Sequence, residues 1–453
     1  MRSLYGIGTP RGLQGLAGTP AALARHLRAA IGRVLGLVRR RIGHLNAIFG
    51  PATVEIRRGR IPRPETLMLD SASIGIPWKV AVPLLLAACG QAVPSADDPA
   101  EAARPWAGGD SWMGVELTSI SDPLLRLSNV LAIAVDSRGR VYVVDALEGG
   151  VIVLSPDLRH LETVGRAGEG PGEFRLKQIQ ILPTDTLFVF DVDLNRVTII
   201  EPDNFEVIDT FLPANLRRGP VPSKLWKLAS SRRFLALIRL PFYAGENDTA
   251  DQGRTDAILA IDEGAEAASD TILVVPSPDF LVARTPGSVA VGTNPFGRVP
   301  FIRLIGRDRF VYTNSGALDV SVVDFTGSIV HSFSFPTVPV PVTSEQLSSR
   351  VSRTFGPLAD VLREGGPYTW PALAGLTVDD EDRIWAGVRG QEGELEWEWA
   401  AFTQNGAHVG SVRLPAGQVL EAVRDDQLYT VSLDSLDVPR IRAYRLREEP
   451  TES

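Results

Sequence analysis

Residues 131–174 decide the fold, and they read LAIAVDSRGRVYVVD (131–145), ALEGGVIVLS (146–155) and PDLRHLETVGRAGEGPGEF (156–174). Three short apolar runs are separated by Ser-Arg-Gly, Glu-Gly-Gly and Pro-Asp, each of which is a turn signal. Side chains alternate within the runs with the period of a strand, not with that of a helix. A fourth run, residues 160–164, precedes a glycine-rich link. The stretch predicts a four-stranded antiparallel meander.

The same unit recurs five more times along the chain. The second strand of each copy, which a tight polar turn introduces, reads RVYVVD, TLFVFD, RFLALI, RFVYTN, RIWAGV and QLYTVS, aligned at Val141, Leu187, Phe234, Phe310, Ile384 and Leu428. Successive copies are 46, 47, 76, 74 and 44 residues apart. Three spacings are close to the period of a propeller blade, and the two long ones fit the same unit with an insertion. The pattern predicts an all-β fold: a six-bladed β-propeller of four-stranded antiparallel blades over residues 112–447.

The two ends of this region predict how the ring closes. The last unit supplies three strands, at residues 418–424, 427–433 and 440–446, and only the tail 448–453 follows. Residues 112–121 alternate apolar and polar side chains and belong to no unit of their own. Because an N-terminal strand that completes the last blade would cover two exposed sheet edges, we expect closure by that strand.

The extra residues predict two unlike faces. The turns between strands one and two, and between three and four, are short and define a short-turn face. The opposite, loop-rich face carries residues 166–174, 244–256, 280–298 and 337–370. Since loops on a rigid scaffold commonly carry binding sites, we expect binding on the loop-rich face. The alternative is that the insertions only decorate the surface.

One helical insertion is expected between blades four and five. Ser344 is the expected N-cap, and apolar side chains follow it at helical spacing: Leu347, Val351, Phe355 and Leu358.

The chain upstream of the propeller divides into three segments. Residues 1–67 hold twelve arginines and two glutamates and form a basic leader, which is either a membrane-surface segment or not translated at all. Residues 68–88 read as a lipoprotein signal peptide, because the apolar run 80–88 is too short to span a bilayer and ends in small residues. Residues 86–90, LAACG, resemble a bacterial lipobox and predict lipid attachment at Cys89, the only cysteine. The alternative is an accidental cysteine after a buried run.

Residues 89–111 are rich in Pro, Ala, Asp and Gly, which predicts a flexible tether. Without residues 1–88 the formal net charge is about −18, which disfavours nucleic acid as a partner. The expected partners are a membrane, through the lipid anchor, and a protein, peptide or glycan ligand. The expected location is the bacterial cell envelope, on the exported side.

The link after the first unit carries a family resemblance. LAIAVDSRGRVYVVD with VIVLS resembles the NHL-type repeat, and the link is similar to that of bacterial exported six-bladed propeller proteins. The matching residues are Gly165, Gly168, Gly170, Pro171, Gly172, Glu173 and Phe174. The resemblance implies the propeller fold and a surface lipoprotein, and it does not imply one known reaction.

Residues that could carry chemistry are few. The chain has no HExxH or GxSxG motif and no Cys/His cluster, so no catalytic residue, metal ligand or cofactor is predicted. Asp145 and Asp191 close equivalent strands, where carboxylates either bind turn amides or ligate a metal. Trp385, Trp397 and Trp399 either pack between blades or line a pocket.

Two functions follow. The first is a non-enzymatic binding scaffold that uses the loop-rich face, with Arg166, Glu169 and Glu173 as candidate polar contacts near the channel mouth. The second is a metal-assisted lactonase- or lyase-type enzyme that uses the central channel. Such an enzyme needs several carboxylates on the innermost strands, and few acidic side chains occur there, so the binding function is favoured.

Overall fold

The computed structural model describes Trp106, Leu125 and Leu216 individually and, otherwise, residues 109–448 with gaps at 121–126, 176, 213–220, 230–231, 240–253, 264–269, 286–287, 390–396 and 416. The leader, the signal segment with Cys89, and most of residues 244–256 lie outside the described residues. In the described part the chain is built from strands, with two helices, α2 (Ser344–Arg353) and α3 (Pro357–Glu364). No helix of that part is long and apolar enough to cross a membrane.

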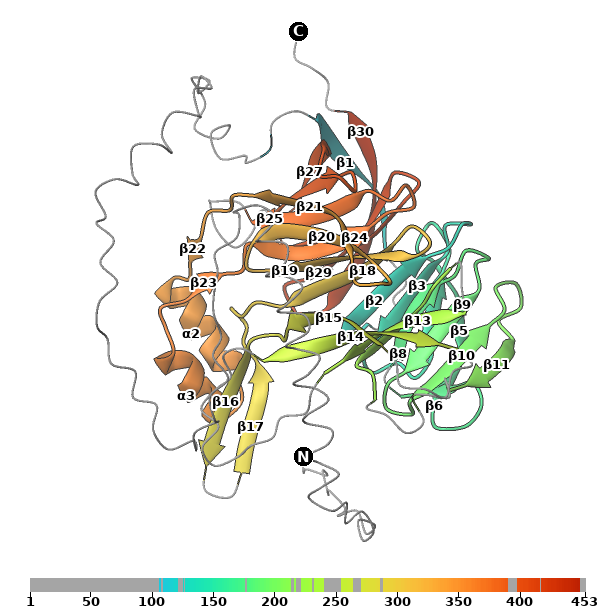
Figure 1. Cartoon of the computed structure of the whole chain (residues 1–453), viewed down its shortest axis with the longest axis horizontal. Helices are drawn as coiled ribbons and strands as arrows, with labels where there is room; N and C mark the ends of the chain where they lie inside the picture. Colours follow the sequence, from blue (N-terminus) through green and yellow to red (C-terminus); the bar gives the residue numbers. More distant parts are fainter. Residues whose placement is uncertain are drawn as a thin grey trace, which may run out of the picture. The chain divides into compact units, whose positions relative to one another are not determined.

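Four sheets have the predicted form of a four-stranded antiparallel meander (Figure 1). The first contains β2 (Val130–Val135), β3 (Val141–Asp145), β4 (Val151–Leu154) and β5 (His160–Val164). The second contains β8 (Lys177–Ile181), β9 (Leu187–Asp191), β10 (Arg196–Ile200) and β11 (Val207–Phe211). The third contains β12 (Lys224–Lys227), β13 (Arg233–Ile238), β14 (Thr255–Asp262) and β15 (Asp270–Pro276). The fourth contains β18 (Pro300–Ile305), β19 (Arg309–Asn314), β20 (Leu318–Asp324) and β21 (Ile329–Phe335).

A fifth sheet has eight strands and joins two four-stranded halves. One half is β24 (Leu373–Val378), β25 (Ile384–Arg389), β26 (Trp397–Phe402) and β27 (His408–Leu414). The other is β28 (Val419–Arg424), β29 (Gln427–Leu433), β30 (Pro439–Glu448) and β1 (Asp110–Ser119). β1 pairs antiparallel with β30, as predicted for the closing strand. It also pairs in parallel with β27, which was not predicted and which merges the two halves.

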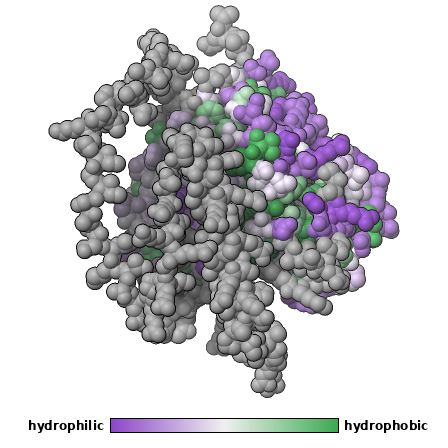
Figure 2. All heavy atoms as spheres, in the orientation of Figure 1, coloured by the Kyte–Doolittle hydropathy of each residue, from purple (hydrophilic) through white to green (hydrophobic). Residues whose placement is uncertain are grey.

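Burial along each sheet explains why these residues form these strands. The second strands β3 (VYVVD) and β9 (LFVFD) are buried at every position, because a neighbouring sheet covers each of their faces. The fourth strand β5 (HLETV) is largely exposed. On the face shown in Figure 2, the coloured residues are mostly hydrophilic with scattered apolar ones.

The apolar core is a series of clusters between successive sheets. Tyr142 and Val144 of the first sheet pack with Leu187 and Val189 of the second. Equivalent clusters join the second to the third sheet, the third to the fourth, the fourth to β24–β27, and the two halves of the eight-stranded sheet. A further cluster packs Tyr429, of the last half, against the first sheet. The arrangement is therefore that of a β-propeller.

The same hydrogen-bond arrangement fixes the turn between the first and second strands in two of the units. The buried Asp136 carboxylate accepts from the Arg138 and Arg140 amides, the Arg140 guanidinium and the Tyr142 hydroxyl. Asp379 does the same with the amides of Glu381 and Arg383, the Arg383 guanidinium and Trp385 Nε1. Because each oxygen has several donors, these carboxylates are structural.

The two long insertions fold together into what we call the insertion subdomain. It contains the hairpin β16 (Phe280–Thr285) and β17 (Ser288–Thr293), the pair β22 (Val340–Pro341) and β23 (Thr369–Trp370), and both helices. Its core holds Leu281, Phe296, Leu358, Leu362 and Trp370. Figure 1 shows α2 and α3 beside the hairpin.

The helical insertion differs from its prediction in detail. The N-cap is Thr343 and not Ser344, because Thr343 makes a reciprocal capping box with Gln346. The single expected helix is two helices, since Gly356 has a φ of 47° and Pro357 starts α3. Phe355, expected on the apolar face, is consequently 83% exposed.

Ordered contacts begin before the expected start of the propeller at residue 112. β1 starts at Asp110, and Trp106, within the segment predicted as a tether, is 6% exposed. Its indole packs edge-on against Phe335 and Phe402, with ring centroids 6.0 and 5.6 Å away. Trp106 is therefore part of the folded core.

Candidate functional site

A cavity runs along the first strands of the sheets. Successive first strands contact one another from β28 to β2, β8 and β12, and from β18 to β24 and β28. The cavity that they surround has a volume of about 470 Å³, and β2, β8, β12, β18, β24 and β28 all contribute to its wall. Small-molecule sites commonly occupy ~300–1,000 Å³. The channel is therefore large enough for a small ligand.

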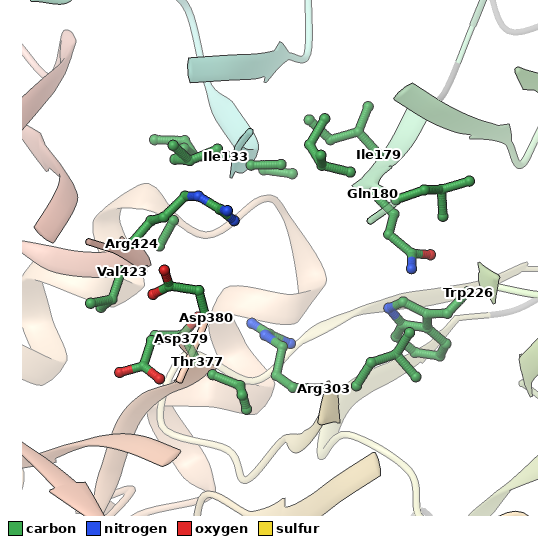
Figure 3. A pocket seen from close by; sticks show the side chains of 18 of the residues that line it. Ile133, Ile179, Gln180, Trp226, Arg303, Thr377, Asp379, Asp380, Val423 and Arg424 are labelled. Carbon is green, nitrogen blue, oxygen red and sulfur yellow. The ribbon is translucent and has the colours of Figure 1, made fainter. Parts of the chain in front are cut away.

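The wall of this cavity is apolar on one side and charged on the other. The stretch from Leu131 to Val135 of β2 contributes only apolar side chains. Lys224 of β12, Arg303 of β18 and Glu421 of β28 contribute charge. Figure 3 shows the Arg303 side chain pointing into the cavity, with Trp226 beside it and Ile133 across from it.

The position of Glu421 depends on a β-bulge. Leu420 pairs with Thr430 and Ala422 pairs with Tyr429, so Glu421 has no partner residue on β29. A bulge of this kind redirects a side chain that regular alternation would place otherwise. Glu421 lines the cavity, and its own carbonyl oxygen accepts from Thr377 Oγ1 at 3.2 Å.

Two glutamines fix β12, the strand that carries Lys224. Gln178 Nε2 donates to the Leu225 carbonyl at 2.9 Å, and its Oε1 accepts from the Leu225 amide at 3.0 Å. Gln180 makes the same pair of bonds to Lys227, at 2.8 and 2.9 Å. The two side chains bond to the backbone along the free edge of β12 as a neighbouring strand would. These bonds fix the strand and hold Lys224 at the channel wall.

The three charged groups influence one another through the cavity. Burial, with smaller effects of the cations Arg303 and Arg239, lowers the pKa of Lys224 to about 8, and Glu421 opposes that change. Burial raises the pKa of Glu421, and Arg303 and Lys224 oppose that rise. Burial also lowers the pKa of Arg303. Lys224 is an exposed residue whose open surface faces the cavity, so its amine is desolvated only in part.

Within the described residues, two of these charges have no partner. Neither the Lys224 ammonium nor the Glu421 carboxylate makes a hydrogen bond or ion pair with another described residue. The Arg303 guanidinium donates only to the neighbouring Ile302 carbonyl, at 3.0 Å. Charges that line a cavity without such bonds mark functional sites more often than structural ones.

The cavity reaches the short-turn face, where the polar groups are largely committed. Asp185 accepts from the Ser137 amide at 2.8 Å, and Asp380 accepts from the Asp425 amide at 3.3 Å. Both bonds join neighbouring units around the mouth. Figure 3 shows Asp379 and Asp380 on the β24 side and Arg424 above them. Lys224, Arg303 and Glu421 belong to the first strands and not to these turns.

The predicted contacts Arg166, Glu169 and Glu173 come together in one loop. Arg166 Nε donates to Glu173 Oε1 at 2.8 Å, and Glu173 Oε2 accepts from the amides of Glu169 and Gly170 at 2.9 and 2.8 Å. Glu169 pairs with Arg175. None of the three lines the described cavity, and each already has a protein partner. Their role as ligand contacts stays a prediction.

The glycines of the same link have backbone and packing requirements. Short strands β6 (Arg166–Ala167) and β7 (Glu173–Phe174) pair in parallel across the loop. Gly165, Gly168 and Gly172 have φ values of 80°, 153° and 70°. A Cβ on Gly165 would lie 2.3 Å from the ring of the buried Phe174. Gly170 and Pro171 lie between the strands in sequence, and the link is a tight loop held by hydrogen bonds within it.

The aspartates and tryptophans that the sequence offered as possible site residues stabilise the fold. Asp145 accepts from the amides of Ser128, Asn129 and Leu147, at 2.7, 2.8 and 3.0 Å. Asp191 likewise accepts from two turn amides. Trp385 and Trp399 are fully buried in the cluster between the two halves of the eight-stranded sheet. The described residues contain no group of three or more His, Cys, Asp or Glu side chains that could hold a metal ion.

Lys224, Arg303 and Glu421 were not predicted from the sequence, because they do not form a set of carboxylates that recurs on the innermost strands. The available signal was a charged residue within each of three apolar first strands, SKLWKL, FIRLIG and VLEAVR. Charged residues that face a neighbouring strand give the same signal, so the sequence alone does not distinguish them from residues that face the channel.

Comparison with known proteins gives a distant structural likeness only. No protein family and no curated protein matches the sequence. A proposed exported protein from Bacteroides fragilis is 13% identical, covers 76% of this chain and 98% of its own, and has a TM-score of 0.43.

Two other solved structures are similar to the same extent. A member of the DUF4221 family from Bacteroides vulgatus is 9% identical over 76% of this chain and 98% of its own, with a TM-score of 0.44. The calcium-binding protein regucalcin from Agrobacterium tumefaciens is 12% identical over 75% and 98%, with a TM-score of 0.37. Because these TM-scores are below 0.5, we draw no functional argument from them.

Proposed function

We propose that this chain is an exported, lipid-anchored six-bladed propeller that binds a small anionic ligand in its central channel. The count of six treats the halves of the eight-stranded sheet as two blades. Six apolar clusters, each between successive units, support that count, and one of them returns from the last unit to the first.

One observation carries the binding proposal. Lys224, Arg303 and Glu421 reach one cavity from three different strands, and two of them have no partner among the described residues. The lining holds five cations and four carboxylates, and Asp185, Asp379 and Asp380 already accept protein hydrogen bonds, so the cavity favours a ligand that carries a carboxylate, phosphate or similar group. The apolar wall of β2 would face the remainder of the ligand.

The structure supports the two functions expected from the sequence to different degrees. The described part of the chain contains no cluster of metal-binding side chains for a metal-assisted lactonase or lyase. The loop-rich face stays a second binding candidate, because both long insertions fold into one subdomain on shared core residues. Its candidate contacts Arg166, Glu169 and Glu173 already pair within the chain.

The anion-binding proposal is tested with matched probes on the full-length chain. Citrate and glucuronate should raise the melting temperature, whereas glucose, which lacks the carboxylate of glucuronate, should not. Arg303→Leu should abolish the shift, and Arg166→Leu should leave it unchanged. If the shift survives Arg303→Leu but disappears with Arg166→Leu, the loop-rich face and not the channel is the site.

Anchoring is tested separately. Cys89→Ala should release the protein from the membrane fraction of a bacterial host, because the proposed lipid is attached to that sulfur. Membrane retention of this variant would contradict the lipid anchor and leave the channel proposal intact.

A further inference from the structure

Lysine is rare in this chain, and its positions are not scattered. Of 46 basic side chains, four are lysines, at positions 79, 177, 224 and 227, and the others are arginines. Lys79 lies outside the described residues, and the other three belong to the first strands β8 and β12. Elsewhere the described chain uses arginine, which keeps its proton in proteins. A lysine differs from arginine in that its amine can become neutral and nucleophilic.

Two of the three described lysines have structural contacts. Lys177 is 6% exposed, and its Nζ donates to the carbonyls of Glu148 and Gly149 at 2.6 and 3.3 Å. Lys227 pairs with Glu263 at 3.3 Å and lies 4.7 Å from the centre of the Phe234 ring. Lys224 has no such contact among the described residues, and its amine opens onto the cavity.

We propose that Lys224 captures a carbonyl-bearing anion, such as a 2-oxo acid or an aldehyde acid, as an imine. This inference rests on the proposed anion-binding function and adds a covalent step to it. Arg303 holds the carboxylate of the ligand, because a guanidinium binds a carboxylate through two parallel hydrogen bonds. The carbonyl carbon is then presented to the amine on the neighbouring strand β12.

The step balances with the groups on the wall. The neutral Lys224 amine attacks the carbonyl carbon and forms a carbinolamine, and loss of one water molecule leaves the C=N bond. The nitrogen passes one proton to the carbonyl oxygen when the carbinolamine forms and a second when it dehydrates, so the oxygen leaves as water. Glu421, the remaining charged group of the three, relays these protons. No oxidant or reductant is required.

The electrostatic setting supports this chemistry. With a pKa of about 8, Lys224 is neutral at pH 7 in roughly one molecule in ten, against well under one in a thousand for an ordinary lysine. Arg303, which favours the neutral amine, lines the cavity and also favours a bound anion.

Reductive trapping of the full-length chain tests the proposal. Glyoxylate, the smallest aldehyde acid, is added with cyanoborohydride at pH 7, and peptide mapping measures modification at each lysine. We expect at least ~10-fold more adduct at Lys224 than at Lys227 or Lys177, because its amine opens onto the cavity, whereas Glu263 and two backbone carbonyls engage the other two amines. Acetaldehyde serves as the uncharged probe and should label Lys224 less than glyoxylate does.

The variants separate the two proposals. Arg303→Leu should abolish the preference for glyoxylate over acetaldehyde, and Lys224→Arg should abolish adduct formation in the channel while anions still raise the melting temperature. Labelling of Lys224 that does not exceed that of Lys227 overturns imine capture, even where anion binding persists. Equal labelling of Lys224 by both aldehydes in the unaltered chain removes anion recognition as well.

Discussion

At the scale of single residues, the chain contains two kinds of charged group: carboxylates buried in turns and charges that line the channel. Asp136 and Asp379 each accept several hydrogen bonds and fix a turn. Lys224 and Glu421 face a cavity, with no hydrogen bond or ion pair to any described residue. The first kind stabilises the fold, whereas the second weakens it until a ligand supplies the missing contacts.

Removal of the Lys224 charge should therefore stabilise the protein. The folded-state pKa is about 8, against an ordinary value of 10.5, so the unfolded chain binds the proton more tightly. The penalty is full below pH 8 and disappears as the pH rises towards 10.5. Lys224→Met should melt at a higher temperature than the unaltered chain at pH 7, and the difference should narrow between pH 8 and 9.5.

Lys227→Met provides the control for this comparison, because it removes an amine from the same strand that is paired with Glu263. It should lower the melting temperature at pH 7. A difference between Lys224→Met and the unaltered chain that stays constant with pH would show that the Lys224 amine is not poorly solvated.

The sequence predicted the candidate site less well than the fold for a local reason. Strand alternation assigns a face to each residue only where the ladder is regular. Glu421 lies at a bulge between Leu420 and Ala422, and a bulge leaves no reliable mark in the sequence. Arg303 and Lys224 occur in apolar runs. The pairing of each run with its neighbouring strand decides which of its side chains face the channel.

At the scale of elements, the repeated second strands were the most predictable feature. All six aligned segments are second strands of their units, because burial on both faces demands continuous apolar sequence. The break between α2 and α3 was missed, since Leu347, Val351 and Phe355 keep helical spacing up to the break at Gly356. Pro357 marked that break, because proline is favoured in the first turn of a helix.

β1 should contribute strongly to stability. Trp112 packs against Trp385 with ring centroids 5.5 Å apart, and the strand pairs with both β27 and β30. Trp112→Ala should lower the free energy of unfolding by about 2–3 kcal/mol, since a large partly buried side chain is removed. The neighbouring Met113, 40% exposed, provides the control. Met113→Ala should change the free energy of unfolding by under about 0.5 kcal/mol. Urea unfolding measures both, and equal losses would contradict the role of β1.

At the scale of the whole molecule, the insertion subdomain has a core separate from the clusters between the sheets. Leu362 is fully buried among Leu281, Phe296 and Trp370. Leu362→Ala should cost about 3 kcal/mol of local stability, because it leaves a cavity in a small core. Hydrogen exchange should accelerate in β16, β17 and α3 and remain slow in β3.

Phe355→Ala is the matched control, because Phe355 is 83% exposed on the same insertion, and it should leave exchange unchanged. If Leu362→Ala accelerates exchange in β3 as well, the subdomain and the sheets unfold as one unit.

The pairing of β1 with β30 has a consequence for the order in which the chain is made. Glu116 and Tyr444 lie 328 residues apart in sequence, yet their side chains meet across these two strands. Synthesis releases β1 before every other strand of the propeller and β30 after all of them. Each intervening sheet can form from local sequence as it emerges, whereas β1 keeps an unpaired edge until the last strand arrives. The molecule thus becomes closed in a single late event, and a chain that stops short of residue 439 retains an open, adhesive edge at its beginning.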